Sequence, residues 1–293
     1  MSQTVSIVIR ALNEAPHIGR LLASLAAQTV MADEVILVDS GSVDGTAEIA
    51  EQFDCKVLHM PPSEFTFGRS LNWGCSSAKG EVLVFVSAHV YPLQPDWLAK
   101  LIEPFEHEQI GLSYGGQTGD HRSNFAEIQL LKRWFPDTGT LQQEDPFCNN
   151  ANCAIRRTLW ETNPYDESLP GLEDLAFARQ IQALGHHVAY VPDARIAHVH
   201  EEGIRQTLNR YRREAMAYNH IFGGTSITLP KAIQLAITNI GTDTTAAVRQ
   251  REIAQILPAA AFRVAQFSGA YLGQRIAKES TNQVVRRMYY PRG

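Results

Sequence analysis

Val5-Ser-Ile-Val-Ile-Arg10 and Glu34-Val-Ile-Leu-Val-Asp39 are two short runs of apolar, largely β-branched residues, and each ends in a charged side chain. Strands that are buried on both faces have this composition, because helices cover both sides of a parallel sheet. Pro16 stands between the two runs, where it can open a helix with Ile18 and Leu22 on its apolar face. The two runs therefore predict a β-α-β unit at the start of an α/β domain.

The same alternation of strands and helices continues beyond this unit. Lys56-Val-Leu-His59 and Val82-Leu-Val-Phe-Val86 predict a third and a fourth strand. Residues 42–53 and 71–78 carry helical signals that follow the second and the third strand. We expect a doubly wound sheet, in which ligands bind at the carboxyl ends of the strands. The residues directly after each strand are therefore candidate site residues.

The periodic pattern weakens after the fourth strand. Helices are expected around residues 98–105 and after Asn124, with a short strand at residues 112–114 between them. Residues 135–149 contain proline, glycine and acids without any period. Such a stretch is typical of a mobile loop that covers an active site.

Length, charge and composition exclude several classes of protein. The 293 residues suffice for one large core or for a core domain with an appendage, and beyond about Gly203 the sequence changes to Arg-rich helical segments and a basic tail. A net charge of −5 without a long Lys/Arg run argues against nucleic-acid binding. Four cysteines lack the paired spacing of a zinc site and are expected as reduced thiols: Cys55, Cys75, Cys148 and Cys153.

Targeting signals are absent from the sequence as given. No basic start or apolar signal core precedes the first strand, and no apolar stretch reaches about 18 residues. We expect a cytoplasmic protein that either stays in solution or lies peripherally on the inner face of the cytoplasmic membrane.

Polar residues follow the first two predicted strands. Asp39 lies at the mouth of the expected crevice, where its carboxylate can accept a hydrogen bond from a pyrimidine N–H; alternatively, Asp39 and Asp44 cap the next helix. Asn13 and Glu14 are placed to meet a nucleoside, although Asn-Glu-Ala-Pro is also ordinary turn chemistry.

The succession Ser6-Ile-Val-Ile-Arg-Ala-Leu-Asn-Glu14, followed by Asp33-Glu-Val-Ile-Leu-Val-Asp-Ser-Gly-Ser-Val-Asp-Gly-Thr46, resembles the start of the family 2 glycosyltransferases. The resemblance covers about the first 200 residues. It implies the GT-A fold of nucleotide-diphospho-sugar transferases, an α/β fold with a mostly parallel central sheet flanked by helices and, here, a C-terminal helical extension. The implied division is a catalytic domain at 1–203, with a nucleotide-binding half at about 1–92 and an acceptor-side half at about 93–203, and an extension at 204–293.

The resemblance also assigns the nucleotide pocket. Asp39 would read the base, and the other residues implied to lie near the nucleotide or its phosphates are Arg10, Asn13, Glu14, Arg69, Asn72, Ser87 and Ala88. Arg69 could equally be a solvated residue of an amphipathic helix.

The expected metal motif is altered in this chain. In the family the fourth strand normally ends in Asp-x-Asp, whose last carboxylate ligates a divalent cation at the donor's diphosphate, whereas Ser87-Ala-His89 stands here. An imidazole can ligate Mn²⁺, while Mg²⁺ prefers oxygen ligands. His198 and His200 share one side of an extended segment, and in related enzymes a histidine there reaches the metal or the diphosphate. We expect a Mn²⁺ or Mg²⁺ site at His89 with His198 or His200; the alternatives are a structural His89 and surface histidines.

Glu173 and Asp174 follow a Pro-Gly turn and enter a predicted helix. Alone, such a pair is commonly a favourable partner of the helix dipole. In the family it provides the general base, so we assign Asp174 as the base and Glu173 as its neighbour and substitute. Asn150 and Asn152 have amides suited to the hydroxyls of the acceptor or donor sugar, or to turn backbone.

Together with these residues, the resemblance implies an inverting glycosyltransferase that moves a sugar from a nucleotide-diphosphate sugar to a saccharide or lipid-linked acceptor, in bacterial cell-envelope polysaccharide assembly. A nucleotide-sugar-binding module without catalysis is the main alternative, because Asp-x-Asp is missing. A dinucleotide oxidoreductase would need Gly-x-Gly-x-x-Gly, which the chain lacks. The Arg-rich helix at 205–213 suits donor phosphates, a lipid-diphosphate acceptor or anionic headgroups; alternatively, it is an ordinary solvated helix. The apolar segment 258–265 suits self-association or packing under the tail.

Overall fold

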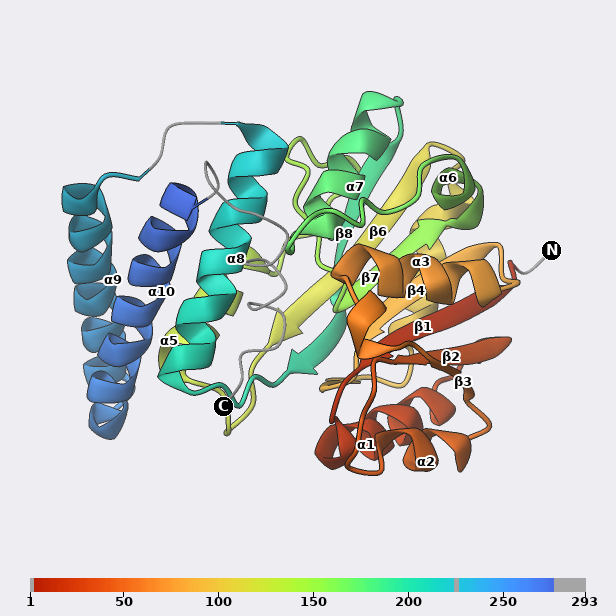
Figure 1. Cartoon of the computed structure of the whole chain (residues 1–293), viewed down its shortest axis with the longest axis horizontal. Coiled ribbons are helices and arrows are strands. Elements are labelled where there is room, and N and C mark those ends of the chain that lie inside the picture. Colours follow the sequence, from red (N-terminus) through yellow and green to blue (C-terminus); the bar gives the residue numbers. More distant parts are fainter. Residues whose placement is uncertain (1–2, 224–226, 277–293) are drawn as a thin grey trace. The chain divides into compact units, whose positions relative to one another are not determined.

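The computed structural model describes residues 3–223 and 227–276, which divide into two compact units (Figure 1). The first unit comprises the chain to Thr118 together with Phe135–Ser168 and Glu173–Val199. The second comprises Gly119–Trp134, Leu169–Leu172 and the chain from His200 onward. The domain boundary placed at residue 203 from the sequence stays a prediction.

The first unit is built on an eight-stranded sheet in the order β3-β2-β1-β4-β7-β6-β8-β5 (Figure 1). The strands are β1 Val5–Ala11, β2 Glu34–Asp39, β3 Lys56–His59, β4 Val82–Ser87, β5 Val90–Pro92, β6 Ile110–Thr118, β7 Asn152–Arg156 and β8 His187–His198. The first four in the sheet order pair in parallel, as do β6 and β8. β7 runs antiparallel to both of its neighbours, and β5 runs antiparallel to β8.

The predicted strands are confirmed. All four strands expected in the N-terminal part are present and parallel, and the strand expected at residues 112–114 lies within β6. The mixed half of the sheet was not predicted. The sequence does not predict β7, because its five residues show no clear alternation of apolar and polar side chains.

Short helices surround the sheet of the first unit. They are α1 Ala15–Ala26, α2 Thr46–Glu51, α3 Phe67–Ser77, α4 Trp97–Ile102, α6 Arg157–Thr162 and α7 Glu173–Ala183, with 3₁₀ turns at Pro62–Glu64 and Glu103–Glu106. The core between β1 and α1 is fully buried, as in Ile9 and Leu21. Gly74 lets α3 approach the sheet closely, because a Cβ there would lie 2.4 Å from Cγ1 of Val8.

Residues 135–149 form neither a helix nor a strand, as expected of a loop. Thr140 nevertheless exchanges two backbone hydrogen bonds with Tyr190 of β8, and the Tyr114 hydroxyl donates to Oε1 of Gln143 at 2.5 Å. The loop is therefore attached to the edge of the sheet, and its mobility stays a prediction.

The second unit is helical: α5 Phe125–Trp134, α8 Ile204–Phe222, α9 Leu229–Arg249 and α10 Ile256–Ile276. α10 packs against the other three helices. Gly269 and Gly273 bring it onto α8, since a Cβ at these positions would lie 2.4 Å and 2.2 Å from the carbonyl oxygens of Leu208 and Arg212. Within the described residues, no helix has both the length and the apolar character needed to cross a membrane.

Candidate active site

The parallel strands bring three of the predicted residues to one edge of the sheet. Asp39 at the end of β2 is in register with Ala11 of β1, and Arg10 is in register with Ser87 of β4. Carboxyl ends of adjacent parallel strands form the usual ligand crevice of such a sheet. Asp39 is buried, whereas Arg10 and Ser87 are half-buried.

Asp39 and Asn13 organise the loop that follows β2. The Asp39 carboxylate accepts hydrogen bonds from the backbone N–H groups of Gly41 and Ser42, each at 3.2 Å. Asn13, whose φ is 55°, accepts from the Val43 N–H at 2.9 Å. The residue that precedes α2 as its N-cap is Gly45, so Asp39 does not cap that helix. The alternative that Asp39 caps this helix is therefore wrong. Its role in reading the base of the nucleotide stays a prediction.

His89 lies directly after β4, between a carboxylate and a second imidazole. Its Nδ1 is 2.9 Å from Oε1 of Glu14, and its ring stacks on His198 with 5.1 Å between the ring centroids and 23° between the planes. The stacking follows from the antiparallel pairing of β5 with β8, which places Val90 opposite His198. His198 is buried, which contradicts the interpretation of that residue as a surface histidine.

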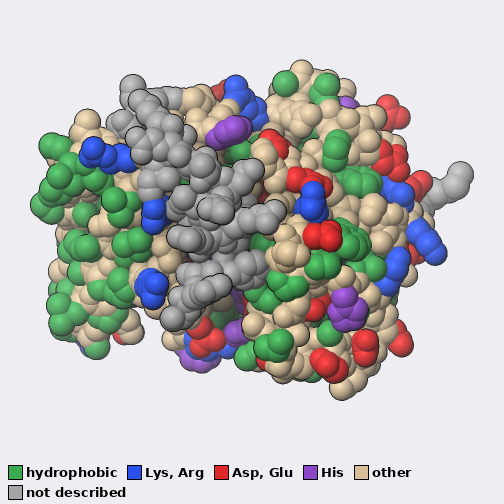
Figure 2. Space-filling view, viewed as in Figure 1, with side chains coloured by type: hydrophobic (Ala, Val, Ile, Leu, Met, Phe, Trp, Pro, Cys, Tyr) green, Lys and Arg blue, Asp and Glu red, His purple; other side chains and the backbone are tan. Residues whose placement is uncertain are grey.

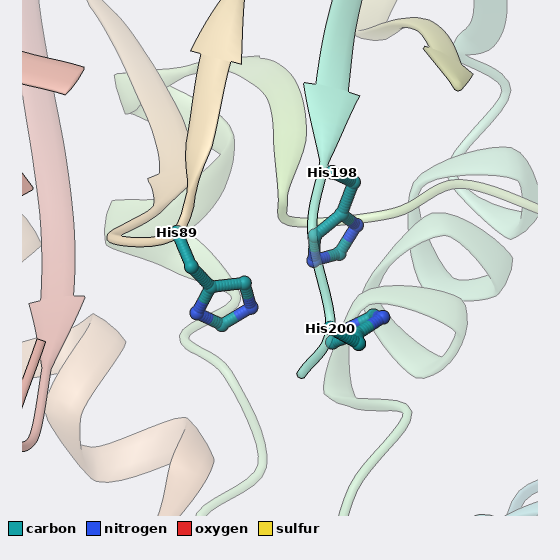
Figure 3. Close-up of side chains that lie close together, drawn as sticks. All are labelled: His89, His198 and His200. Atoms are coloured by element: carbon teal, nitrogen blue, oxygen red, sulfur yellow. The ribbon is translucent and has the colours of Figure 1, made fainter. Parts of the chain in front are cut away.

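His89, His198 and His200 each offer a ring nitrogen, and these ligand atoms all lie within 4.8 Å of one another (Figure 3). His200 is two residues beyond His198 and is the first residue of the second unit. Two further contacts define the ring orientations: Nδ1 of His198 is 2.8 Å from Oε1 of Gln117, and Nδ1 of His200 is 2.9 Å from Oε1 of Glu127.

These oxygen partners determine the tautomer of each imidazole. An oxygen acceptor at Nδ1 keeps the proton there and leaves the lone pair on Nε2, which is the ligand form of histidine. Three imidazoles with such outer partners suit a divalent transition-metal cation such as Mn²⁺ better than Mg²⁺, which favours oxygen ligands. The side chains at this position therefore fit a cation.

The predicted base lies at the start of α7, where the two acids have different surroundings. Oε1 of Glu173 is 2.9 Å from a guanidinium nitrogen of Arg10, so its charge is compensated. Oδ2 of Asp174 accepts from the Asn150 N–H at 3.1 Å, and Oδ1 accepts from the Leu175 N–H at 2.9 Å. No cation forms an ion pair with Asp174 among the described residues.

These surroundings make Asp174 unusually basic. Burial and, after it, the negative charge of Glu173 raise the pKa of its carboxyl to about 7, against the opposing effects of the two backbone N–H groups and of the charge of Arg10. A carboxylate with such a pKa accepts a proton from a weakly acidic donor more readily than an ordinary aspartate does.

The two predicted amides have different surroundings. Nδ2 of Asn152 donates to the carbonyls of Gly116 and Ala194 at 3.1 and 2.7 Å, and its Oδ1 accepts from the Trp97 indole at 2.9 Å. Both polar atoms of the Asn152 side chain are therefore occupied by hydrogen bonds within the protein. The Nδ2 of Asn150, in contrast, is buried and has no hydrogen-bond partner in the described part of the chain, which leaves a donor close to Asp174.

Arg69 and Asn72 of α3 contact the segment before α7. Arg69 pairs with Glu167 at 2.7 Å, and Asn72 donates to the Tyr165 carbonyl at 2.9 Å while accepting from the Trp160 indole at 2.9 Å. Arg69 remains substantially exposed. Both residues therefore attach α3 to the segment before α7. Their contact with a nucleotide stays a prediction.

Sequence reasoning missed the outer partners of the histidines. Gln117 and Glu127 are 81 and 73 residues away from the imidazoles that they contact. Burial would raise the pKa of Glu127, but the hydrogen bond and charge of His200 and the charge of Arg210 lower it to about 2. No local pattern marks such long-range partners, so only the paired strands and packed helices reveal them.

Comparison with known proteins identifies the family of the chain. The model of glycosyl transferase family 2 matches residues 6–162, which is more than half of the chain. The chain belongs to glycosyl transferase family 2. The matched residues of this chain extend from β1 to β7 and end before Glu173 and Asp174 of α7.

Two curated relatives in the family come from Salmonella. The chain is 26% identical over 195 residues to the O-antigen chain rhamnosyltransferase WbaN of Salmonella anatum, a match that covers 63% of this chain and 62% of that protein. It is 23% identical over 219 residues to the O-antigen chain rhamnosyltransferase RfbN of Salmonella typhimurium, covering 71% of this chain and 70% of the relative.

Solved structures confirm the GT-A fold. The mannosyltransferase PcManGT from Pyrobaculum calidifontis, solved with GDP-Man and Mn²⁺, has a TM-score of 0.62 at 19% identity and covers all of this chain and 89% of its own. Glucosyl-3-phosphoglycerate synthase from Mycobacterium tuberculosis, solved with Mn²⁺ and UDP, has a TM-score of 0.56 at 20% identity, covering 78% of this chain and 84% of its own.

Proposed function

We propose that this chain transfers a sugar, with inversion, from a nucleoside-diphosphate donor to a hydroxyl of a saccharide or lipid-linked acceptor, and that Asp174 is the general base. Family membership supports transfer from an activated sugar. The observation that carries the assignment of the base is the contrast between the two acids: Glu173 is paired with Arg10, whereas Asp174 is buried, forms no ion pair with any described residue and has a raised pKa.

The proposed reaction is a single displacement. The acceptor oxygen attacks the anomeric carbon while its proton moves to Asp174, and the bond to the diphosphate breaks with the electron pair leaving on the diphosphate. Attack from the face opposite the leaving group inverts the anomeric configuration. Asn150 is proposed to donate from its unpartnered Nδ2 to a sugar hydroxyl, which would satisfy a buried donor.

Arg10, Asn13, Glu14, Asp39, Ser87 and Ala88 are proposed to line the nucleotide pocket at the carboxyl edge of β1, β2 and β4. Glu14 also contacts His89, so we propose that it orients this imidazole. A divalent cation held by His89, His198 and His200 would neutralise charge that develops on the departing diphosphate. Because all three ligands are nitrogens, we propose Mn²⁺ rather than Mg²⁺.

The relatives in Salmonella support a role in cell-envelope polysaccharide assembly, with a deoxyhexose or hexose donor. The cytoplasmic location and the peripheral membrane contact expected from the sequence stay predictions, as does the formation of homo-oligomers.

A panel of nucleotide sugars with saccharide acceptors tests this function. We expect one donor to be turned over, Mn²⁺ to support the rate better than Mg²⁺, and the product to have the opposite anomeric configuration by nuclear magnetic resonance. Donor binding without turnover, with acceptors present, would instead favour a nucleotide-sugar-binding module. Retention of configuration would contradict a single displacement.

A further inference from the structure

α9 exposes an apolar stripe that no described residue covers. Its exposed members are Leu229, Ile233, Ile237 and Val248, which are 50, 51, 66 and 53% exposed. Their spacing of four, four and eleven residues confines them to an arc of roughly 100° on the helix surface. Figure 2 shows hydrophobic side chains gathered over the part of the view where Figure 1 draws α9.

A shallow hollow lies along the first half of this stripe. It has a volume of about 520 Å³ and is lined by Leu229, Pro230, Ile233, Gln234, Ile237 and Thr238. From the first to the last apolar residue the stripe is about 28 Å long, at 1.5 Å per residue. An elongated apolar stripe of this kind matches an extended surface better than it matches a small ligand.

α10 carries a second apolar stripe that ends in a cation. Leu257, Val264 and Leu272 are 81, 54 and 40% exposed, and their spacing of seven and eight residues places them on one side of the helix. Arg275 follows on that same side and is exposed, with its guanidinium 5.3 Å from the ring centroid of Tyr271. Arginine at the end of an apolar helical face can extend its charge to a polar boundary.

The charge of this part of the chain is opposite to that of the rest. Residues 227–293 contain nine Lys or Arg and only three Asp or Glu, although the whole chain has a net charge of −5. One of the three acids, Asp243, is buried in an ion pair with Arg263 at 2.7 Å. Among the described residues of this segment, the other charged side chains are one exposed acid, Glu252, and four exposed cations: Lys231, Arg249, Arg251 and Arg275.

We infer that α9 and α10 dock on an anionic lipid surface, with their apolar stripes inserted at the headgroup level and the exposed guanidinium of Arg275 on the phosphates. Exposed apolar residues together with cations are the features by which interfacial helices bind such membranes. A second copy of the chain fits less well, because pairing through this face would bring two cationic segments together. The inference does not depend on sugar transfer.

Co-sedimentation of the full chain with vesicles tests this inference. Vesicles of about one third phosphatidylglycerol in phosphatidylcholine are compared with pure phosphatidylcholine, at low and high salt. We expect binding to the anionic vesicles, at least tenfold weaker binding to the neutral ones, and a loss of affinity at high salt.

The variant Ile233→Glu/Ile237→Glu places two carboxylates on the exposed stripe and should weaken binding about tenfold or more. Leu184→Glu is the matched control, since Leu184 is 53% exposed in the first unit, and its binding should equal that of the wild type. Circular dichroism establishes that both variants are folded.

Three results would overturn the inference: wild-type protein that stays in the supernatant with anionic vesicles, equal binding to neutral vesicles, or full binding by the double variant. A concentration-dependent dimer that the double variant abolishes, without vesicle binding, would identify a second copy as the occupant. Donor turnover in solution is measured on the same samples, so a failure here is distinguishable from a failure of the proposed transferase activity.

Discussion

At the scale of single residues, Asp174 is distinguished from Glu173 by its partners. Both side chains are buried at the start of α7, yet among the described residues only Glu173 forms an ion pair with an arginine. The charge that remains on Glu173 then raises the pKa of Asp174 in addition to burial. The adjacent acid thus raises the proton affinity of Asp174, the proposed base, by its charge.

Replacement of Glu173 by Gln tests this tuning. Loss of the negative charge, with Arg10 no longer neutralised, should lower the pKa of Asp174 from about 7. The acidic limb of the kcat profile should then move to lower pH by on the order of one unit, while kcat above the limb falls because the base is weaker. Glu167→Gln removes an exposed acid paired with Arg69 and is the control. An unmoved limb in Glu173→Gln would show that Glu173 does not act through Asp174.

The histidine cluster predicts a preference among cations. His89→Ala should weaken Mn²⁺ binding by about tenfold or more, because one of three ligands is lost, and should hardly change the already weak Mg²⁺ binding. Isothermal titration in the presence of a nucleoside diphosphate measures both affinities. His17→Ala is the matched control, since His17 contacts His89 edge-on with 6.4 Å between centroids but is not part of the cluster. Equal Mn²⁺ affinity in the two variants would argue against a metal at His89.

At the scale of helices and strands, the sequence predicts elements better than it predicts their partners. Apolar runs in the sequence identify the first four strands, β1 to β4. The segments that contain β1 and β2 also carry the resemblance to the family that the comparison confirms. The antiparallel β7 and the pairing of β8 with β5 depend on contacts between distant segments, which no local pattern contains. For the same reason His89 was identified as a candidate ligand, whereas Gln117 was not.

In the second unit, one buried ion pair joins two helices. Arg263 of α10 contacts both carboxylate oxygens of Asp243 of α9 and donates to the carbonyl of Ala126 in α5. Asp243→Ala leaves this guanidinium buried and uncompensated, so we expect a loss of about 3–5 kcal/mol in urea unfolding. Asp243→Leu combined with Arg263→Met should lose less than Asp243→Ala.

Arg249→Ala, at an exposed position on α9, should change stability by less than about 0.5 kcal/mol. A similarly small loss for Asp243→Ala would mean that the pair does not hold the helices together.

At the scale of the whole molecule, the two perturbed acids give opposite pH dependences of stability. The folded state binds the proton of Asp174 more tightly than the unfolded state does, because its pKa is raised from 3.8 to about 7. Its contribution therefore favours folding below pH 4 and is lost as the pH rises through about 7. Glu127, with its pKa lowered to about 2, contributes stability at neutral pH that is lost as the pH falls.

Asp174→Asn should accordingly be more stable than the wild type at about pH 8, by on the order of 1–4 kcal/mol, and the difference should vanish near pH 4. Glu127→Gln should show the reverse at pH 8, with lower stability than the wild type. Urea unfolding at several pH values measures both differences. A constant difference between Asp174→Asn and the wild type across this range would contradict the raised pKa.

Asp174→Asn also provides the most direct test of the central claim, which is that this carboxylate is the base of a glycosyl transfer. Single-turnover transfer is measured beside donor binding, for the variant and the wild type, with the donor that the panel identifies. The account predicts unchanged donor affinity and a transfer rate reduced by about 10²–10⁴, because only the proton acceptor is removed. Transfer by the folded variant at close to the wild-type rate would contradict the account.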